Sequence, residues 1–157
     1  MPRRYYPRRS YGSRDKYSVE QNTFRITLDN NTAQNSIVVV PSTTIEGMRK
    51  VKHITISVSN SGSTVNTLYW AIVYVPAGYT CNNLRLPDIN SGGALYEPNQ
   101  FVMNAGCFDL DAGPSRLTSP VARNLNSGDS IYLVVGSPGL GSTMNLNGLV
   151  RYAITLQ

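Results

Sequence analysis

The chain has 157 residues, of which 41% are hydrophobic and 15% are charged, and its formal net charge is +5. This length allows one domain with a sizeable buried core, and the charged fraction is well below the roughly 25% typical of soluble domains. The net charge lies entirely in residues 1–16, which carry six basic side chains and one acid, whereas residues 17–157 carry eight of each. Residues 1–16 hold no aliphatic side chain except Met1, which excludes a packed core there and favours contact with a polyanion.

Two further classes are disfavoured by the composition. The uncharged apolar run from Leu68 to Val75 is too short to cross about 30 Å of hydrocarbon, so we expect no membrane insertion. The N-terminal arginines are not followed by an apolar h-region, so we expect no secretory signal. Cys81 and Cys107 form no C-x-x-C pair, which favours free thiols in an intracellular setting over a disulfide and leaves open whether the two meet.

Residues 1–16 form a basic arm in which arginines alternate with tyrosines. Arginine binds phosphates through two hydrogen bonds and tyrosine stacks on unpaired bases, so this pattern predicts contact with single-stranded nucleic acid without sequence reading. Pro2 and Pro7 favour an extended, non-helical arm, which we expect to be disordered. A solubilising tail or a nuclear-import signal is the alternative. The candidate nucleic-acid-binding residues are Arg3, Arg4, Tyr5, Tyr6, Arg8, Arg9, Tyr11, Arg14 and Lys16.

The remainder of the chain carries strand signals and almost no helical periodicity. Short alternating or β-branched segments are bounded by Gly, Pro, Asn and Ser. The Ser127-Gly128-Asp129 sequence predicts a tight turn, and Asn147-Gly148 predicts a type I′ turn or a bulge. A long connection, rich in Gly, Asn and Pro, is expected at 77–96. The expected strands cover residues 24–29, 36–41, 51–59, 68–76, 99–108, 116–124, 130–135 and 142–156.

These elements predict an all-β domain at 17–157, preceded by the arm at 1–16. About eight strands with edges to protect favour a two-sheet sandwich, a jelly roll or a small barrel. The strand at 68–76 is apolar nearly throughout, which is typical of a strand buried on both faces, and its Trp70 is expected in the core.

No catalytic constellation is visible, and we expect no enzyme activity and no cofactor. The one histidine, His53, has no G-x-S-x-G nucleophile elbow to serve and is expected to be a strand residue. Asp109 and Asp111, two residues apart, are minor candidates for a calcium site; a solvated strand end or an ion pair with a neighbouring subunit's arginine is the alternative.

A second basic patch is expected on the folded body. Strand alternation puts Arg25, His53 and Arg151 on polar faces, and Lys50 and Lys52 begin the third strand. In a jelly roll the first, third and last of these strands share a sheet, so these five residues could line one surface with the arm. Scattered surface charges are the alternative.

The chain resembles the jelly-roll coat proteins of small circular single-stranded DNA viruses, the circovirus-like group. The resemblance is carried by the arm RRYYPRRSYGSR, the strand TFRITL, the aromatic strand LYWAIVYVPAGY and the ending GLVRYAITLQ. The coat proteins of satellite RNA viruses share this plan. The arm is shorter than circoviral arms, and the domain is shorter too.

The resemblance implies a single eight-stranded antiparallel jelly roll that assembles with itself into a T=1-like shell of about 60 subunits. The arm would package the single-stranded genome, DNA in preference to RNA, in a virion that could assemble in the host nucleus. Loops such as 77–98 and 109–120 would lie between neighbouring subunits. Two alternatives remain: a carbohydrate- or ligand-binding β-sandwich, and a non-capsid single-strand nucleic-acid-binding protein.

Overall fold

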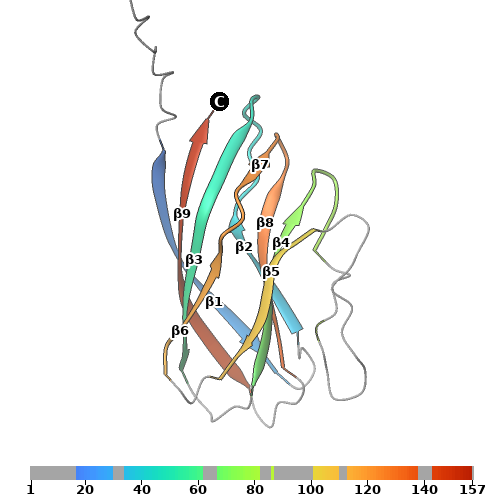
Figure 1. The fold of residues 1–157 in the computed structure, drawn as a ribbon. Helices are drawn as coiled ribbons and strands as arrows, with labels where there is room; N and C mark the ends of the chain where they lie inside the picture. The colour runs from blue at the N-terminus through green and yellow to red at the C-terminus, as the bar shows by residue number, and fades with distance from the viewer. Residues whose placement is uncertain are drawn as a thin grey trace, which may run out of the picture.

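The computed structural model describes residues 17–29, 34–61, 67–81, 86, 101–109, 113–137 and 143–156. Nine antiparallel strands form two sheets that pack face to face (Figure 1). Among the described residues, no helix is long and apolar enough to cross a membrane. The strands are β1 (Ser18–Leu28), β2 (Gln34–Val40), β3 (Arg49–Ser61), β4 (Leu68–Val75), β5 (Phe101–Phe108), β6 (Ser115–Ser119), β7 (Arg123–Leu125), β8 (Ser130–Gly136) and β9 (Met144–Leu156).

The strand order is that of a jelly roll. One sheet has the order β1-β9-β3-β6, with β7 also paired to β3, and the other has the order β2-β8-β4-β5. Successive strands therefore change sheet except at β4–β5 and β6–β7, and β1 at the start of the fold pairs with β9 at its end. The predicted all-β jelly roll is confirmed by this order.

The core lies between the sheets because alternate side chains of each strand point inward. Ile26 and Leu28 of β1 are buried, as are Ile54, Ile56 and Val58 of β3. From the facing sheet, the inward residues of β4 are Leu68, Trp70 and Ile72, all buried. Trp70 is thus a core residue, as predicted.

One expected strand is in fact two. The sequence predicted a single strand over 116–124, but β6 ends at Ser119 and β7 begins at Arg123. Pro120 follows β6 directly and has no N–H to donate to the ladder, so pairing with β3 stops and resumes three residues later. Both pieces pair with β3, so together they fill one strand position of the eight-stranded plan.

The turn or bulge predicted at Asn147-Gly148 is wrong. Both residues lie within β9, where Gly148 pairs with Phe24 on one side and Val58 on the other. A Cβ added to Gly148 would overlap Cζ of the Phe24 ring. The glycine therefore makes room for an aromatic ring across the ladder, which is one reason for Gly inside a strand.

The turn predicted at Ser127-Gly128-Asp129 is confirmed. Asp129 N donates to Asn126 O at 3.1 Å, and Gly128 has a φ of 86°, in the left-handed region that favours glycine. Gly128 N also donates to Thr43 O at 2.9 Å, which attaches this turn to the β2–β3 connection.

Candidate nucleic-acid interface

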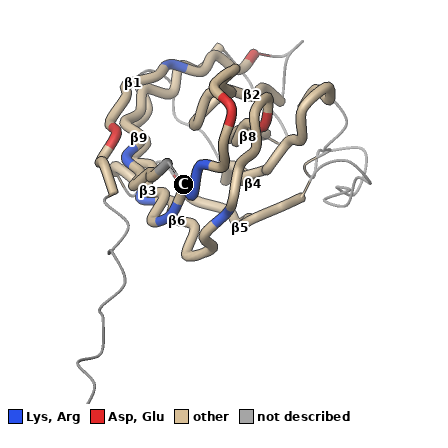
Figure 2. Tube along the Cα trace, turned by 90° about the horizontal axis from the view of Figure 1, so that it is seen from above, with Lys and Arg blue, Asp and Glu red and all other residues tan. Residues whose placement is uncertain are grey.

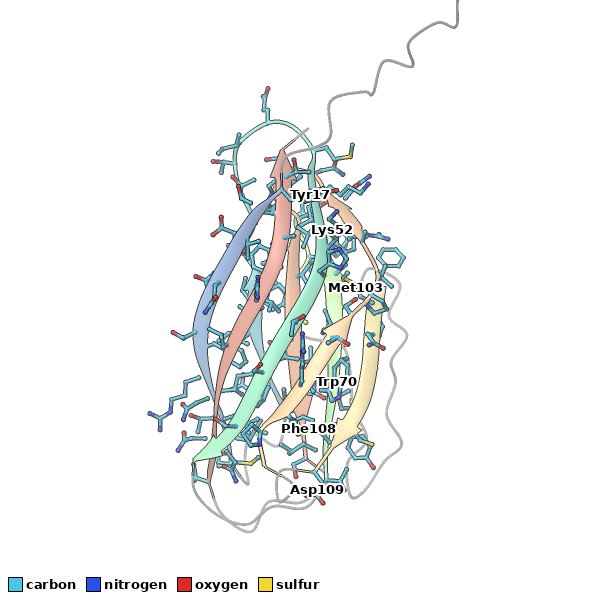
Figure 3. The ribbon with its side chains drawn as sticks, turned by 60° about the vertical axis from the view of Figure 1, so that its left-hand side comes forward. Tyr17, Lys52, Trp70, Met103, Phe108 and Asp109 are labelled. Carbon is cyan, nitrogen blue, oxygen red and sulfur yellow. The ribbon has the colours of Figure 1, made fainter. Side chains whose placement is uncertain are left out.

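The predicted arm at 1–16 lies outside the described residues, so its nine candidate residues stay a prediction. The described chain begins at Tyr17, immediately before β1. The Tyr17 ring lies against Lys52, whose Nζ is 3.5 Å from the ring centroid (Figure 3). This cation–π contact places the point where the arm joins the body next to a cation of β3.

The sheet that contains β1, β9, β3 and β6 has one face on the core and one face directed away from it. The ladder fixes which residues share the second face: Gln21 of β1 lies opposite Arg151 of β9, which lies opposite Thr55 of β3. We call this surface the basic face. Its basic residues are Arg25, Lys50, Lys52, His53, Arg116 and Arg151.

A bulge in β3 explains how consecutive basic residues reach the same face. The register of β3 against β9 shifts between Lys52 and Thr55, and His53 has a φ of 56°. Strand alternation before the shift turns Val51 inward and Lys52 outward, and after it turns Ile54 inward and Thr55 outward. His53, in the left-handed region uncommon for non-glycine residues, is the extra residue and is exposed beside Lys52.

A shallow groove of about 480 Å³ crosses the middle of the basic face. Three basic side chains line it, together with polar residues and a few apolar ones such as Val19 and Leu149. The basic side chains are His53, Arg116 and Arg151. The sequence analysis missed Arg116, which joins the groove because β6 places it opposite Ser57. Its alternation with buried Leu117 was the signal that could have found it.

Arg25 is set apart from this groove. It lies opposite Asn147, four residues along β1 from the Gln21–Arg151 pair, which corresponds to about 13 Å along the strand. Its Nε donates to Asn145 Oδ1 at 3.3 Å, and the same oxygen accepts a 2.8 Å bond from Thr27 Oγ1. The structure thus brings Lys50, Lys52, His53 and Arg151 toward one end of the basic face and places Arg25 toward the other.

Three of the described acids, Glu20, Glu46 and Asp129, lie off the basic face, whereas Asp29 directly follows β1 and Asp109 follows β5. Glu20 lies opposite buried Tyr152 in the ladder, so it is on the same side of β1 as the core-facing side chains. Glu46 belongs to the β2–β3 connection, and Asp129 is buried at the start of β8. Figure 2 shows basic segments around β9, β3 and β6, and acidic segments over β1 and near β2 and β8. Among the described residues, the cations of the basic face therefore gather on the strands of one sheet.

The outward face of the other sheet is apolar. Ala71, Val73 and Val75 of β4 and Val134 of β8 are buried beneath Cys81 and Leu86 of the β4–β5 connection. Leu86 N donates to Gln34 Oε1 at 2.8 Å, which fixes the connection to β2. Cys81 and Leu86 cover the chain's own sheet, because β4 is apolar on both sides. The expected place of residues 77–98 between subunits stays a prediction, and residues 82–85 and 87–98 lie outside the described residues.

Both cysteines are free thiols, as the sequence favoured. Cys81 is buried and Cys107 is exposed on β5. Burial raises the pKa of the Cys81 thiol to about 11, because the thiolate would lose its hydration there.

The candidate metal pair is only half described. Asp109 is exposed directly after β5, at the end of the sandwich opposite Tyr17 and Lys52 (Figure 3), and Asp111 lies outside the described residues. Among the residues that the structure describes, no three His, Cys, Asp or Glu side chains come together. The calcium site stays a prediction.

Comparison with known proteins gives structural matches only. No family model matches the chain, and no curated protein matches it. A structure of Desmodium yellow mottle tymovirus is similar with a TM-score of 0.34 and 14% identity, over 100% of this chain and 97% of that one. The VP2 subviral particle of infectious bursal disease virus is similar with a TM-score of 0.27 and 12% identity, over 91% of this chain and 43% of VP2. The fold assignment rests on the strand order of the chain itself.

Proposed function

We propose that this chain is a viral capsid protein, which self-assembles into a closed shell and packages single-stranded nucleic acid. The observation that carries the proposal is the one-sided charge of a jelly roll. Its five-stranded sheet presents Lys52, Arg116 and Arg151 on the basic face, and the cationic arm joins the body at Tyr17, on the same surface. A domain whose cations lie on one sheet can bind a polyanion with that sheet, while its second sheet faces away from the polyanion.

In this proposal the basic face and the arm point toward the genome. The arm contacts phosphates through its arginines, and its tyrosines stack on unpaired bases. The groove at Arg116 and Arg151 adds contacts to the backbone from a rigid surface. No catalytic step is assigned to the protein, since subunit burial and charge neutralisation supply the free energy of assembly, and its location is the virion.

The resemblance of the sequence motivates the finer part of the proposal. The shell is of T=1 type with about 60 copies, and the cargo is single-stranded DNA in preference to RNA. Arms of net +5 from about 60 copies bring about 300 positive charges to the genome. Neighbouring subunits then meet through the ends of the sandwich and its edges.

The test is the nucleic-acid content of the assembled protein. The full chain and a variant lacking residues 2–16 are purified and sized, and absorbance is compared at 260 and 280 nm. We expect both to assemble, and only the full chain to retain nuclease-protected nucleic acid. Assembled particles of the full chain without nucleic acid would contradict packaging, and an equal content in both variants would contradict the role of the arm.

A second candidate is a non-capsid protein that binds single-stranded nucleic acid. The groove favours it, because the body gathers His53, Arg116 and Arg151 on one face although it is neutral as a whole. A monomer that binds oligothymidylate through the groove would support this candidate over the capsid. A monomer that binds a glycan with calcium, and no oligonucleotide, would instead support the ligand-binding sandwich.

A further inference from the structure

A second hollow lies where β7 pairs with the beginning of β3. Its volume is about 490 Å³, and it opens to solvent. The lining is mostly polar, and among the described residues it carries two cations and no acid. The lining residues are Lys50, Tyr74, Ala122, Arg123, Asn124 and Asn126. In the ladder Lys50 lies opposite Asn124, and Arg123 is the next residue of the same short strand. The hollow therefore lies beside β7, and of its lining residues the sequence analysis named only Lys50, as part of the expected basic patch.

Aromatic rings hold Arg123 in place. Its Cζ is 4.2 Å from the centroid of the Tyr74 ring and 5.2 Å from that of Phe101, and the two centroids are 5.9 Å apart. Ring contacts occupy the faces of a guanidinium and leave its in-plane N–H groups available for oxygen acceptors. Because Arg123 is half-buried and already packs against two rings, binding an anion costs little further side-chain entropy.

The nearby carboxylate forms no ion pair with these cations among the described residues. Asp129 is buried and accepts hydrogen bonds from Tyr74 Oη at 2.8 Å, Asn126 N at 2.7 Å and Ala77 N at 3.0 Å. Burial raises the pKa of Tyr74, as do its hydrogen bond to Asp129 and the charge of Asp129, and these effects outweigh the opposing effect of Arg123, so the phenol stays neutral. Among the described residues, neither Lys50 nor Arg123 forms an ion pair.

We propose that this hollow binds a phosphate group. Lys50 and Arg123 neutralise its oxygens, and the side-chain amides of Asn124 and Asn126 supply neutral donors. Phe101 is 49% exposed next to Arg123, so its ring is available to a base when the phosphate belongs to a nucleotide. The site is distinct from the groove at Arg116 and Arg151, and it does not depend on the capsid function.

The test is equilibrium dialysis of the full chain against labelled orthophosphate in about 0.15 M chloride. We expect saturable binding that weakens at least about tenfold in Lys50→Gln/Arg123→Gln. Lys50→Gln alone, which leaves the ring stack intact, weakens it by a smaller factor. Thr67→Glu, an exposed position before β4 with a charge change of the same sign, is the control and leaves the affinity within about twofold. Binding by residues 1–16 is common to all variants and drops out of the comparison.

Thymidine monophosphate and thymidine distinguish the source of the phosphate. If the unmodified chain binds the monophosphate more tightly than orthophosphate, and Phe101→Ser loses this difference, the ligand is a nucleotide. If both are bound with the same affinity, and Phe101→Ser does not change it, the ligand is a free phosphate. The proposal is overturned if orthophosphate does not bind saturably, if folded Lys50→Gln binds it as tightly as the unmodified chain, or if thymidine binds as tightly as its monophosphate. Circular dichroism verifies that each variant is folded.

Discussion

At the scale of single residues, the packing of Gly148 against Phe24 shows how one missing side chain sets the register of β1 against β9. The Phe24 ring occupies the space above Gly148, and a Cβ there would overlap Cζ and lie 2.6 Å from Cε1 of that ring. Because β1 pairs with β9 along its whole length, the backbone holds Phe24 opposite Gly148, and an added methyl group there would force the ring to shift.

Gly148→Ala is expected to lower the free energy of unfolding by about 1–3 kcal/mol, because the added methyl group overpacks the Phe24 site. Urea denaturation measures the change. In a Phe24→Leu background, where the ring is absent, the same substitution should cost less than half as much. Equal costs in the two backgrounds would show that the ring contact is not the cause.

Cys81 predicts a loss of stability at alkaline pH. Its pKa is raised from 9.0 to about 11 by burial, so above pH 9 the unfolded chain loses a proton that the folded chain keeps. This contribution is complete below pH 9 and is lost as the pH rises toward 11. The pKa values of Tyr74 and Tyr152 are also raised by burial, so the profile must be compared with that of Cys81→Ala.

The measurement is chemical denaturation between pH 8 and pH 11, and the expected result is a steeper decline for the unmodified chain than for Cys81→Ala. Thiol titration in the native state should detect one reactive cysteine, Cys107, and denaturant should release the second. Parallel pH profiles would contradict the burial of Cys81.

At the scale of elements, one buried carboxylate connects the loops at the end of the sandwich where β1 begins. Asp129 binds Asn126 N of its own turn, Ala77 N after β4 and Tyr74 Oη. Arg49, also buried, donates from Nη2 to Asp129 O at 3.3 Å and from Nη1 to Pro41 O at 3.1 Å. The β2–β3, β4–β5 and β7–β8 connections are therefore joined through two residues.

Asp129→Ala should destabilise the fold by about 3–5 kcal/mol, since three donors lose a charged acceptor in a buried place. Tyr74→Phe removes one of these bonds and should cost about 1–2 kcal/mol. Thermal and urea denaturation measure both. A cost for Asp129→Ala no larger than that of Tyr74→Phe would show that the backbone bonds contribute nothing.

The expected elements follow from alternation, and the differences follow from contacts between distant segments. Ile54, Ile56 and Val58 identified β3 correctly, because period-2 burial is local. The pairing register determines the bulge at His53 and places Arg116 opposite Ser57. This register depends on strands that are far apart in the sequence, so the local pattern around either residue does not reveal it. The Asn147-Gly148 sequence predicted a turn because the reason for the glycine, its contact with Phe24, involves a residue that is far away in the sequence.

At the scale of the whole molecule, the basic face predicts a salt-dependent contribution of the body to nucleic-acid binding. In the full chain, Arg116→Gln/Arg151→Gln should lower the affinity for oligothymidylate about tenfold. It should also reduce the slope of log K against log salt by about 1.4, since each phosphate contact on a single strand contributes about 0.7. Fluorescence anisotropy over a chloride series measures both, and Thr67→Glu is the control. An unchanged slope would remove the groove from the interface.

The central claim is a closed shell whose basic face points inward, and cryo-electron microscopy of the purified full chain tests it most directly. The account predicts uniform particles of about 20 nm built from about 60 copies, with Arg116 and Arg151 on the lumenal side and the four-stranded sheet farther from the centre. A 17.2 kDa monomer at all concentrations, or a shell with the basic face on its exterior, would contradict it.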